Sequence, residues 1–87
     1  MKIKNILMED KIKEKILYKH KVKADEIKEL FLSKPLILKS RENRYIAIGH
    51  NLRFLTIIFE VVGETAFIIT AYPSSEAQRK LYKLKKK

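Results

Sequence analysis

The pattern of apolar and polar residues divides the chain into a helical beginning, a strand-rich middle and a helical end. Near the beginning, Met8, Ile12 and Ile16 recur at every fourth position with charged residues between them. That period places one apolar stripe on a helix, so we predict a helix over Glu9–Lys19. The same kind of stripe predicts a second, shorter helix over Ala24–Leu32, which ends before a proline because the residue preceding proline avoids the helical region.

After Pro35 the pattern changes to alternation or to continuous apolar runs, which is typical of strands. Four strands are predicted, over Leu36–Ser40, Arg44–His50, Leu52–Val62 and Thr65–Tyr72. A tight hairpin at Gly63 joins the last two. The face of the third strand with Ile57 and Phe59 is strongly apolar, whereas the face of the fourth with Tyr72 is mixed. We therefore expect helices on one side of the sheet and a partly open other side.

A basic helix is predicted at the end of the sequence. Ser75 and Gln78 have the spacing of a capping box, and Ala77, Leu81 and Leu84 form an apolar stripe. The order α–α–β–β–β–β–α predicts an α+β fold with two N-terminal helices, a four-stranded, mainly antiparallel sheet and a C-terminal helix. We expect one domain over residues 1–87.

Positive charge is concentrated at the two helical ends. Twenty Lys and Arg against ten Asp and Glu give a net charge of +10. Residues 1–34 carry +4, residues 35–73 carry +1 and residues 74–87 carry +5. Such a field attracts phosphate backbones, anionic membranes or acidic proteins, and nucleic acid is the commonest of these partners for a soluble basic domain. A lysine surface that serves only solubility is the alternative.

The composition excludes several classes of site. There is no cysteine, which excludes a disulfide scaffold and a cysteine zinc site. His20 and His50 lack acidic partners at ligand spacing and aspartate is scarce, so we expect no metal centre and no cofactor. No apolar run approaches the ~20 residues of a membrane span, and the N-terminus does not resemble a signal peptide. We expect a soluble, cytoplasmic protein without a membrane partner.

The residues with chemical potential are basic and aromatic. They stand at strand ends and on the final helix: Arg44, Tyr45, His50, Arg53, Tyr72, Arg79 and Tyr82. Arginine can clamp a phosphate, and tyrosine and histidine can stack on bases or transfer protons. If His50, Arg53 and Tyr72 converge at one rim of the sheet, they could support metal-free RNA cleavage, in which the RNA's own 2′-OH attacks the neighbouring phosphate.

The same residues also have purely structural interpretations. Arg44 and Arg53 flank strands, where solvated charges are common. His50 can be an ordinary turn residue and Tyr82 a half-buried packing residue. His20 follows the first helix and can interact with the negative end of the helix dipole.

Three stretches, "KHKV", "RYIAIGHNLRFLTIIFEVVG" and "FIITAYPSSEAQRKLY", occur in an order and spacing that resemble the BrnT family of toxins. These are small ribonucleases with the RelE-like fold. The family has a Lys-His-Gly-Val turn; Lys19-His20 and Val22 match it, and Lys21 replaces the glycine. Arg53 matches an arginine that opens a strand in the family.

The end of the chain continues this resemblance with one substitution. Ile69-Thr70-Ala71-Tyr72 stands where the family has Ile-Ser-Ala-Arg, so Tyr72 replaces the strand-end arginine. Gln78-Arg79 takes the place of a Glu-Arg pair, and Tyr82 follows at the expected distance.

The resemblance implies a ribonuclease toxin of a type II toxin–antitoxin system. Such a protein cleaves mRNA without metal, in association with the ribosome, and is neutralised by a bound antitoxin. Arg53 would stabilise the scissile phosphate, while Tyr72, His50 or His20 would transfer protons or stack on bases. The RNA-binding residues would be Lys19, Arg44, Arg79, Lys80 and Tyr82. Two alternatives stay open, namely a non-catalytic RNA- or protein-binding module of the same fold and a purely structural basic domain.

Overall fold

A computed structural model describes residues 2–86 of the chain. Its elements in chain order are β1 (Asn5–Leu7), α1 (Asp10–His20), α2 (Ala24–Leu32), β2 (Leu36–Lys39), β3 (Arg44–His50), β4 (Phe54–Val62), β5 (Thr65–Pro73) and α3 (Glu76–Lys85). The expected α+β class, the three helices and the hairpin at Gly63 are confirmed, and the bounds of α2 are those predicted. Gly63 has a φ of 64°, the left-handed conformation that this turn requires and that glycine adopts readily.

The sheet has five strands rather than the predicted four. Its order is β1-β5-β4-β3-β2, and β1 pairs in parallel with the beginning of β5, with Ile6 opposite Ala66. All other neighbours are antiparallel. The prediction missed β1 because a strand of three residues is too short to show a period of two.

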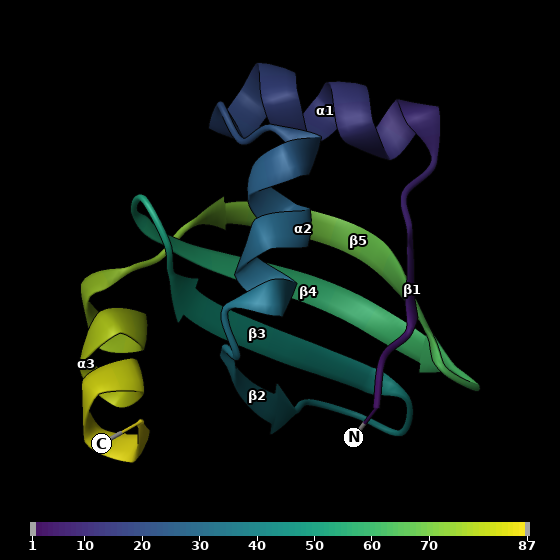
Figure 1. The fold of residues 1–87 in the computed structure, drawn as a ribbon. Coiled ribbons are helices and arrows are strands. Elements are labelled where there is room, and N and C mark those ends of the chain that lie inside the picture. Colours follow the sequence, from purple (N-terminus) through teal and green to yellow (C-terminus); the bar gives the residue numbers. More distant parts are fainter. Residues whose placement is uncertain (1, 87) are drawn as a thin grey trace.

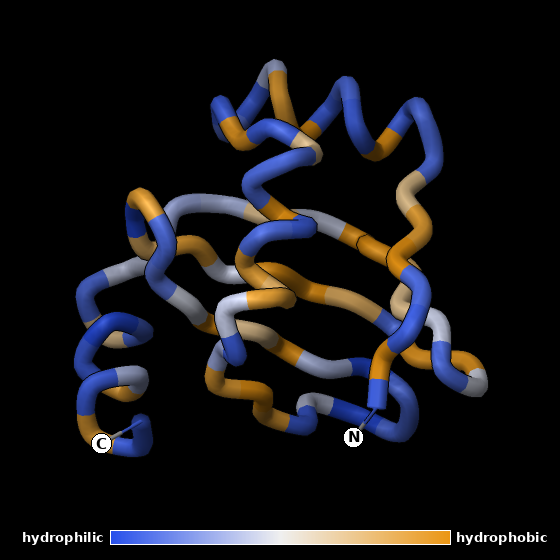
Figure 2. Tube along the Cα trace, viewed as in Figure 1, coloured by the Kyte–Doolittle hydropathy of each residue, from blue (hydrophilic) through white to orange (hydrophobic). Residues whose placement is uncertain are grey.

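The three helices occupy different places around this sheet, as Figure 1 shows. Helix α2 crosses one face, α1 lies along the β5 side, and α3 stands at the end of the sheet where β3 and β5 end. In Figure 2, hydrophobic residues concentrate along the strands, whereas α1 and α3 are mostly hydrophilic.

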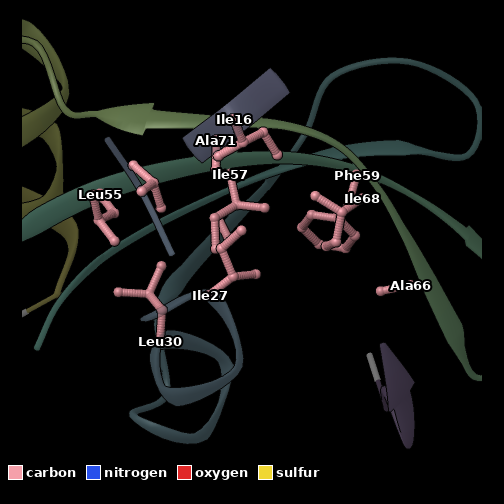
Figure 3. Close-up of a cluster of buried hydrophobic side chains, with 11 residues drawn as sticks. Ile16, Ile27, Leu30, Leu55, Ile57, Phe59, Ala66, Ile68 and Ala71 are labelled. Atoms are coloured by element: carbon pink, nitrogen blue, oxygen red, sulfur yellow. The ribbon is translucent and has the colours of Figure 1, made fainter. Parts of the chain in front are cut away.

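A core of aliphatic side chains fixes α1 and α2 on the sheet. Ile16 of α1 and Ile27 of α2 meet Ile57 and Phe59 of β4, all buried (Figure 3). Burying each such side chain contributes roughly 1.5–3 kcal/mol, which anchors the turn between the two helices against the sheet.

Helix α2 approaches β3 closely because β3 has a glycine at the contact. A Cβ atom on Gly49 would lie 2.7 Å from Cδ1 of Leu30, so any larger residue would force the buried Leu30 side chain to shift. This contact is one residue before the end of β3, and it brings α2 close to that end of the sheet.

Helix α3 differs from the others in how little it buries. No side chain between Glu76 and Lys85 is fully buried, and Leu84 of the predicted apolar stripe is 69% exposed. The helix is held instead by Tyr82, which packs edge-on against Phe54 with ring centroids 5.4 Å apart, and by the hydrogen bonds of its first turn.

Candidate functional site at the end of the sheet

Most of the predicted residues gather where β3 ends, β4 begins and β5 ends. The α1–α2 turn and the first turn of α3 complete this region (Figure 1). We call the group formed by His20, Glu26, Arg53, Tyr72 and Gln78 the end-of-sheet site. Its two sides are held by different elements, Arg53 by α2 and Tyr72 by α3.

The guanidinium of Arg53 forms a forked pair with the carboxylate of Glu26. Its Nε donates to Oε2 over 2.9 Å and its Nη2 to Oε1 over 3.1 Å. Nη2 also donates to the backbone carbonyl of Lys21, in the α1–α2 turn. Within residues 2–86, Nη1 has no hydrogen-bond partner, and the side chain is 39% exposed. The hydrogen bonds of Nε and Nη2 thus hold the guanidinium group in place, while Nη1 remains available to a ligand.

Glu26 has a second role in the same turn. Its Oε1 accepts from the backbone N–H of Lys23 over 3.2 Å, which is one half of a capping box. The hydrogen bond from Arg53 lowers the pKa of Glu26, partial burial opposes this change, and the Lys23 N–H lowers it further. Glu26 is therefore ionised at neutral pH and can hold Arg53 as a charged pair.

Tyr72 lies beside His20, with ring centroids 6.0 Å apart and planes at 54°. The two residues come from the end of β5 and the last turn of α1. The Tyr72 hydroxyl oxygen accepts a hydrogen bond from Nε2 of Gln78 over 3.0 Å. Because that oxygen accepts from Gln78, its own proton is directed elsewhere and can be donated to a ligand.

Gln78 is itself fixed by a polar network at the start of α3. Its Oε1 accepts from Thr56 Oγ1 and from the Ser75 N–H, both over 2.9 Å. Ser75 Oγ accepts from the Gln78 N–H over 3.2 Å, which confirms the predicted capping box. Thr56 is fully buried and also contacts Ser74 Oγ over 2.8 Å. The capping box therefore orients the side-chain amide that reaches Tyr72.

His50 belongs to a neighbouring aromatic row. Its ring lies 4.5 Å from that of Phe54, which in turn contacts Tyr82. Lys83 Nζ lies 6.0 Å from the centre of the Phe54 ring. A shallow hollow is lined by Phe54, Glu76, Arg79, Lys80 and Lys83, and Lys80 pairs with Glu76 over 3.4 Å. This surface offers an aromatic face among cations, which suits a stacked base and its phosphates.

Arg44 is not part of either group. It lies at the opposite end of β3 from His50, six residues or about 20 Å away along the strand. Its Nη2 pairs with Glu60 over 3.2 Å. Lys19, by contrast, is exposed in the last turn of α1, next to His20.

Two residues of this site were assigned only structural roles by the sequence. Glu26 is one of the acidic residues in the first turn of α2, where the helix dipole favours negative charge, and Gln78 was predicted only as part of a capping box. Their contacts with Arg53 and Tyr72 each join two different elements, Glu26 lying 27 residues from Arg53 and Gln78 six residues from Tyr72, and helical or strand periodicity does not reveal such contacts. Among residues 2–86, no three His, Asp or Glu side chains lie together as metal ligands. No helix in that range has the length and apolarity to cross a bilayer.

No family model matches the sequence, and no curated protein matches it either. A solved structure does resemble this one, that of BrnT, a ribonuclease toxin of Brucella abortus. The two share 26% identity with a TM-score of 0.71, over 83% of this chain and 97% of that one. The chain has a BrnT-like toxin fold. The resemblance first carried by the "KHKV" turn and the later strands is confirmed in three dimensions.

Lys21, in the turn between α1 and α2, has a backbone conformation that glycine adopts more easily than lysine. Lys21 ends α1 with φ 57° and ψ 36°, in the left-handed region, and its N–H donates to the Leu17 carbonyl over 3.1 Å. Glycine adopts this conformation without strain, whereas a lysine does so at a cost. The carbonyl of the same residue accepts a hydrogen bond from Arg53, so this turn positions the guanidinium group.

Proposed function

We propose that this protein is an endoribonuclease toxin of a type II toxin–antitoxin system, which cleaves mRNA without a metal ion and is neutralised by a bound antitoxin. The observation that carries the proposal is the arrangement of His20, Tyr72 and Arg53 around one turn of a BrnT-like fold. An acceptor and donor of protons lie there beside a fixed cation, the combination that phosphodiester cleavage needs.

The reaction uses a nucleophile that the RNA supplies. The 2′-OH attacks the adjacent phosphorus, so the O2′–P bond forms and the P–O5′ bond breaks. His20 or Tyr72 takes the proton from the 2′-OH, and the other gives a proton to the departing 5′ oxygen. Nη1 of Arg53 stabilises the charge that builds on the phosphate, with the guanidinium held by Glu26. The products carry a 2′,3′-cyclic phosphate and a 5′-OH.

The RNA strand would lie across the neighbouring basic and aromatic surface. Arg79 and Lys80 would hold phosphates next to the scissile one, and Tyr82 with His50 would support a base through Phe54. Lys19 would contact the strand on the other side, beside His20. Arg44 would meet RNA only when the bound strand extends along β3.

Expression without an antitoxin tests the toxin part of the proposal. The wild-type protein is expected to arrest growth, and the His20→Ala/Tyr72→Phe double variant is expected to permit it at equal protein level. A matched Arg44→Ala variant, altered away from the end-of-sheet site, should still arrest growth. Arrest by the double variant would contradict the assigned roles.

A second candidate function is supported by two observations. Tyr72 stands where the BrnT pattern has an arginine, and two of the three nitrogens of Arg53 are engaged by Glu26 and Lys21. Both features fit a module that binds RNA or a protein without catalysis. Purified protein incubated with RNA separates the two functions, because the module would bind in a salt-sensitive manner and leave the RNA intact.

A further inference from the structure

Away from the end-of-sheet site, the N-terminal segment and α2 enclose an apolar groove. Two adjoining hollows make it up and share Lys4, Ile6 and Leu32 as lining residues. One lies between β1 and α2, and the other extends to Pro35 at the start of β2. We call this surface the β1–α2 groove.

The β1–α2 groove exposes large aliphatic side chains on a rigid base. Leu32, the last residue of α2, is 83% exposed, and Leu7 of β1 is 52% exposed. Beneath them, Phe31 packs edge-on against buried Phe59, with ring centroids 5.1 Å apart. Aliphatic surface that is held open in this way is typical of an interface rather than of a surface facing only water.

The charged side chains that line the groove are all basic. Its lining includes four lysines, Lys2, Lys4, Lys28 and Lys34, and, within residues 2–86, no acidic side chain. In the part of the chain that the structure describes, Lys4 alone among these four has an acidic partner, Glu64, at 3.6 Å, and that pair is exposed. Lys34 additionally adopts a φ of 57°, so its position at the rim is maintained against backbone strain.

From this combination we infer that the β1–α2 groove binds an acidic segment of a second protein, which inserts apolar side chains against Leu7 and Leu32. An apolar floor with a rim of lysines is complementary to apolar anchors flanked by Asp or Glu. RNA fits less well, because the lining has no arginine and its one aromatic ring, Phe31, is partly buried. A second copy of this chain would be repelled by its charge of +10.

This surface is separate from the end-of-sheet site. In the sheet, Leu7 is opposite Phe67, and Tyr72 follows five residues later at the other end of β5. Five residues of strand span about 17 Å, so the groove and Tyr72 lie at opposite ends of β5. The inference therefore stands whether or not the protein cleaves RNA.

Nuclear magnetic resonance with a synthetic peptide tests the inference. The probe is an amphipathic helical peptide with leucines on one face and glutamates on the other, added to the ¹⁵N-labelled protein. Shifts are expected at the backbone of residues 3–7 and 28–37. The same peptide with glutamine in place of glutamate should bind at least tenfold more weakly, since it lacks the charges that meet the lysines.

Two matched variants locate the binding. Leu32→Asp is expected to weaken peptide binding at least tenfold, because it places a negative charge in the groove. Leu52→Asp changes a leucine of almost equal exposure, 82%, outside the groove and should leave binding unchanged. Equal binding by Leu32→Asp, equal binding of the glutamine peptide, or shifts confined to the end-of-sheet site would overturn the inference. So would binding of phosphatidylglycerol vesicles that depends on Leu32, since the occupant would then be a lipid surface.

Discussion

The two sides of the end-of-sheet site hold their side chains by different means. Arg53 is fixed by a charged pair with Glu26 on α2, an element anchored in the core by Ile27. Tyr72 is fixed by a neutral hydrogen bond from Gln78 on α3, a helix with no fully buried side chain between Glu76 and Lys85. The position of Arg53 therefore depends on the ionisation of Glu26 and on the packing of α2 in the core, whereas the position of Tyr72 depends on the N-terminal cap of α3. Variants can separate these dependences.

The largest effect is expected from the arginine side. Arg53→Ala removes the cation that is hydrogen-bonded to the Lys21 carbonyl, next in sequence to His20, and should lower the rate of RNA cleavage by about 100-fold or more. Cleavage of a short oligoribonucleotide under single-turnover conditions measures this. Arg44→Ala, the control, should leave the rate unchanged, because Arg44 is remote from the site. An Arg53→Ala rate equal to wild type would remove Arg53 from the mechanism.

The tyrosine side can be weakened without disturbing the helix cap. Gln78→Glu keeps the acceptor for Thr56 and for the Ser75 N–H but loses the N–H donated to Tyr72. We expect kcat to fall about tenfold with KM unchanged, since only the orientation of the hydroxyl is lost. Thermal unfolding should be close to that of wild type. Gln78→Ala is the comparison, and it should lose both stability and kcat because it also removes the cap.

The charged pair between Arg53 and Glu26 should make the free energy of unfolding depend on pH. Because Arg53 lowers the pKa of Glu26 below its ordinary value of 4.5, the stabilisation is complete above that value. It is lost as the pH falls through the lower pKa of the folded state. Glu26→Gln should therefore reduce the free energy of unfolding by about 1–2 kcal/mol at neutral pH.

Chemical denaturation across a pH series measures this difference. The gap between wild type and Glu26→Gln is expected to be constant above the ordinary pKa of Glu26 and to shrink in more acidic solution. A gap independent of pH would show that Glu26 acts through its shape and cap rather than through its charge.

The smallest effect concerns the turn that carries His20. Lys21→Gly relieves the left-handed conformation at φ 57° and should raise the free energy of unfolding by ~1 kcal/mol. Lys19→Gly is the matched control, because it makes the same change inside α1 and should lower stability by ~1 kcal/mol. Thermal unfolding of both variants and of the wild type measures these two changes in stability. Destabilisation by Lys21→Gly would contradict the strain assigned to this turn.

Local patterns were sufficient for most of the fold. The bounds of α2 and the capping box at Ser75 followed from residues three or four apart, whose side chains meet on one helical turn. Strand β1 was not predicted because it is short and is defined only by its pairing with Thr65–Phe67, sixty residues away. Helix α3 shows that an apolar period does not guarantee burial, because its predicted apolar stripe contains no fully buried side chain.

The sequence predicted several residues of the candidate site but not how they are arranged in space. The sequence offered His20, His50 and Tyr72 as equal choices for proton transfer. The folded structure distinguishes them, because His20 contacts Tyr72 whereas His50 contacts Phe54. The partners of Arg53 and Tyr72 depend on how α2 and α3 pack on the sheet, which no local spacing specifies.

The chemistry of the cleaved ends tests the central claim most directly. Purified protein is incubated with an oligoribonucleotide in excess EDTA, and the product masses are determined. We predict fragments with a 2′,3′-cyclic phosphate and a 5′-OH, and no cleavage of a substrate with 2′-deoxyribose at the scissile position. Fragments with a 3′-OH and a 5′-phosphate, or RNA left intact by the wild-type protein, would contradict the account.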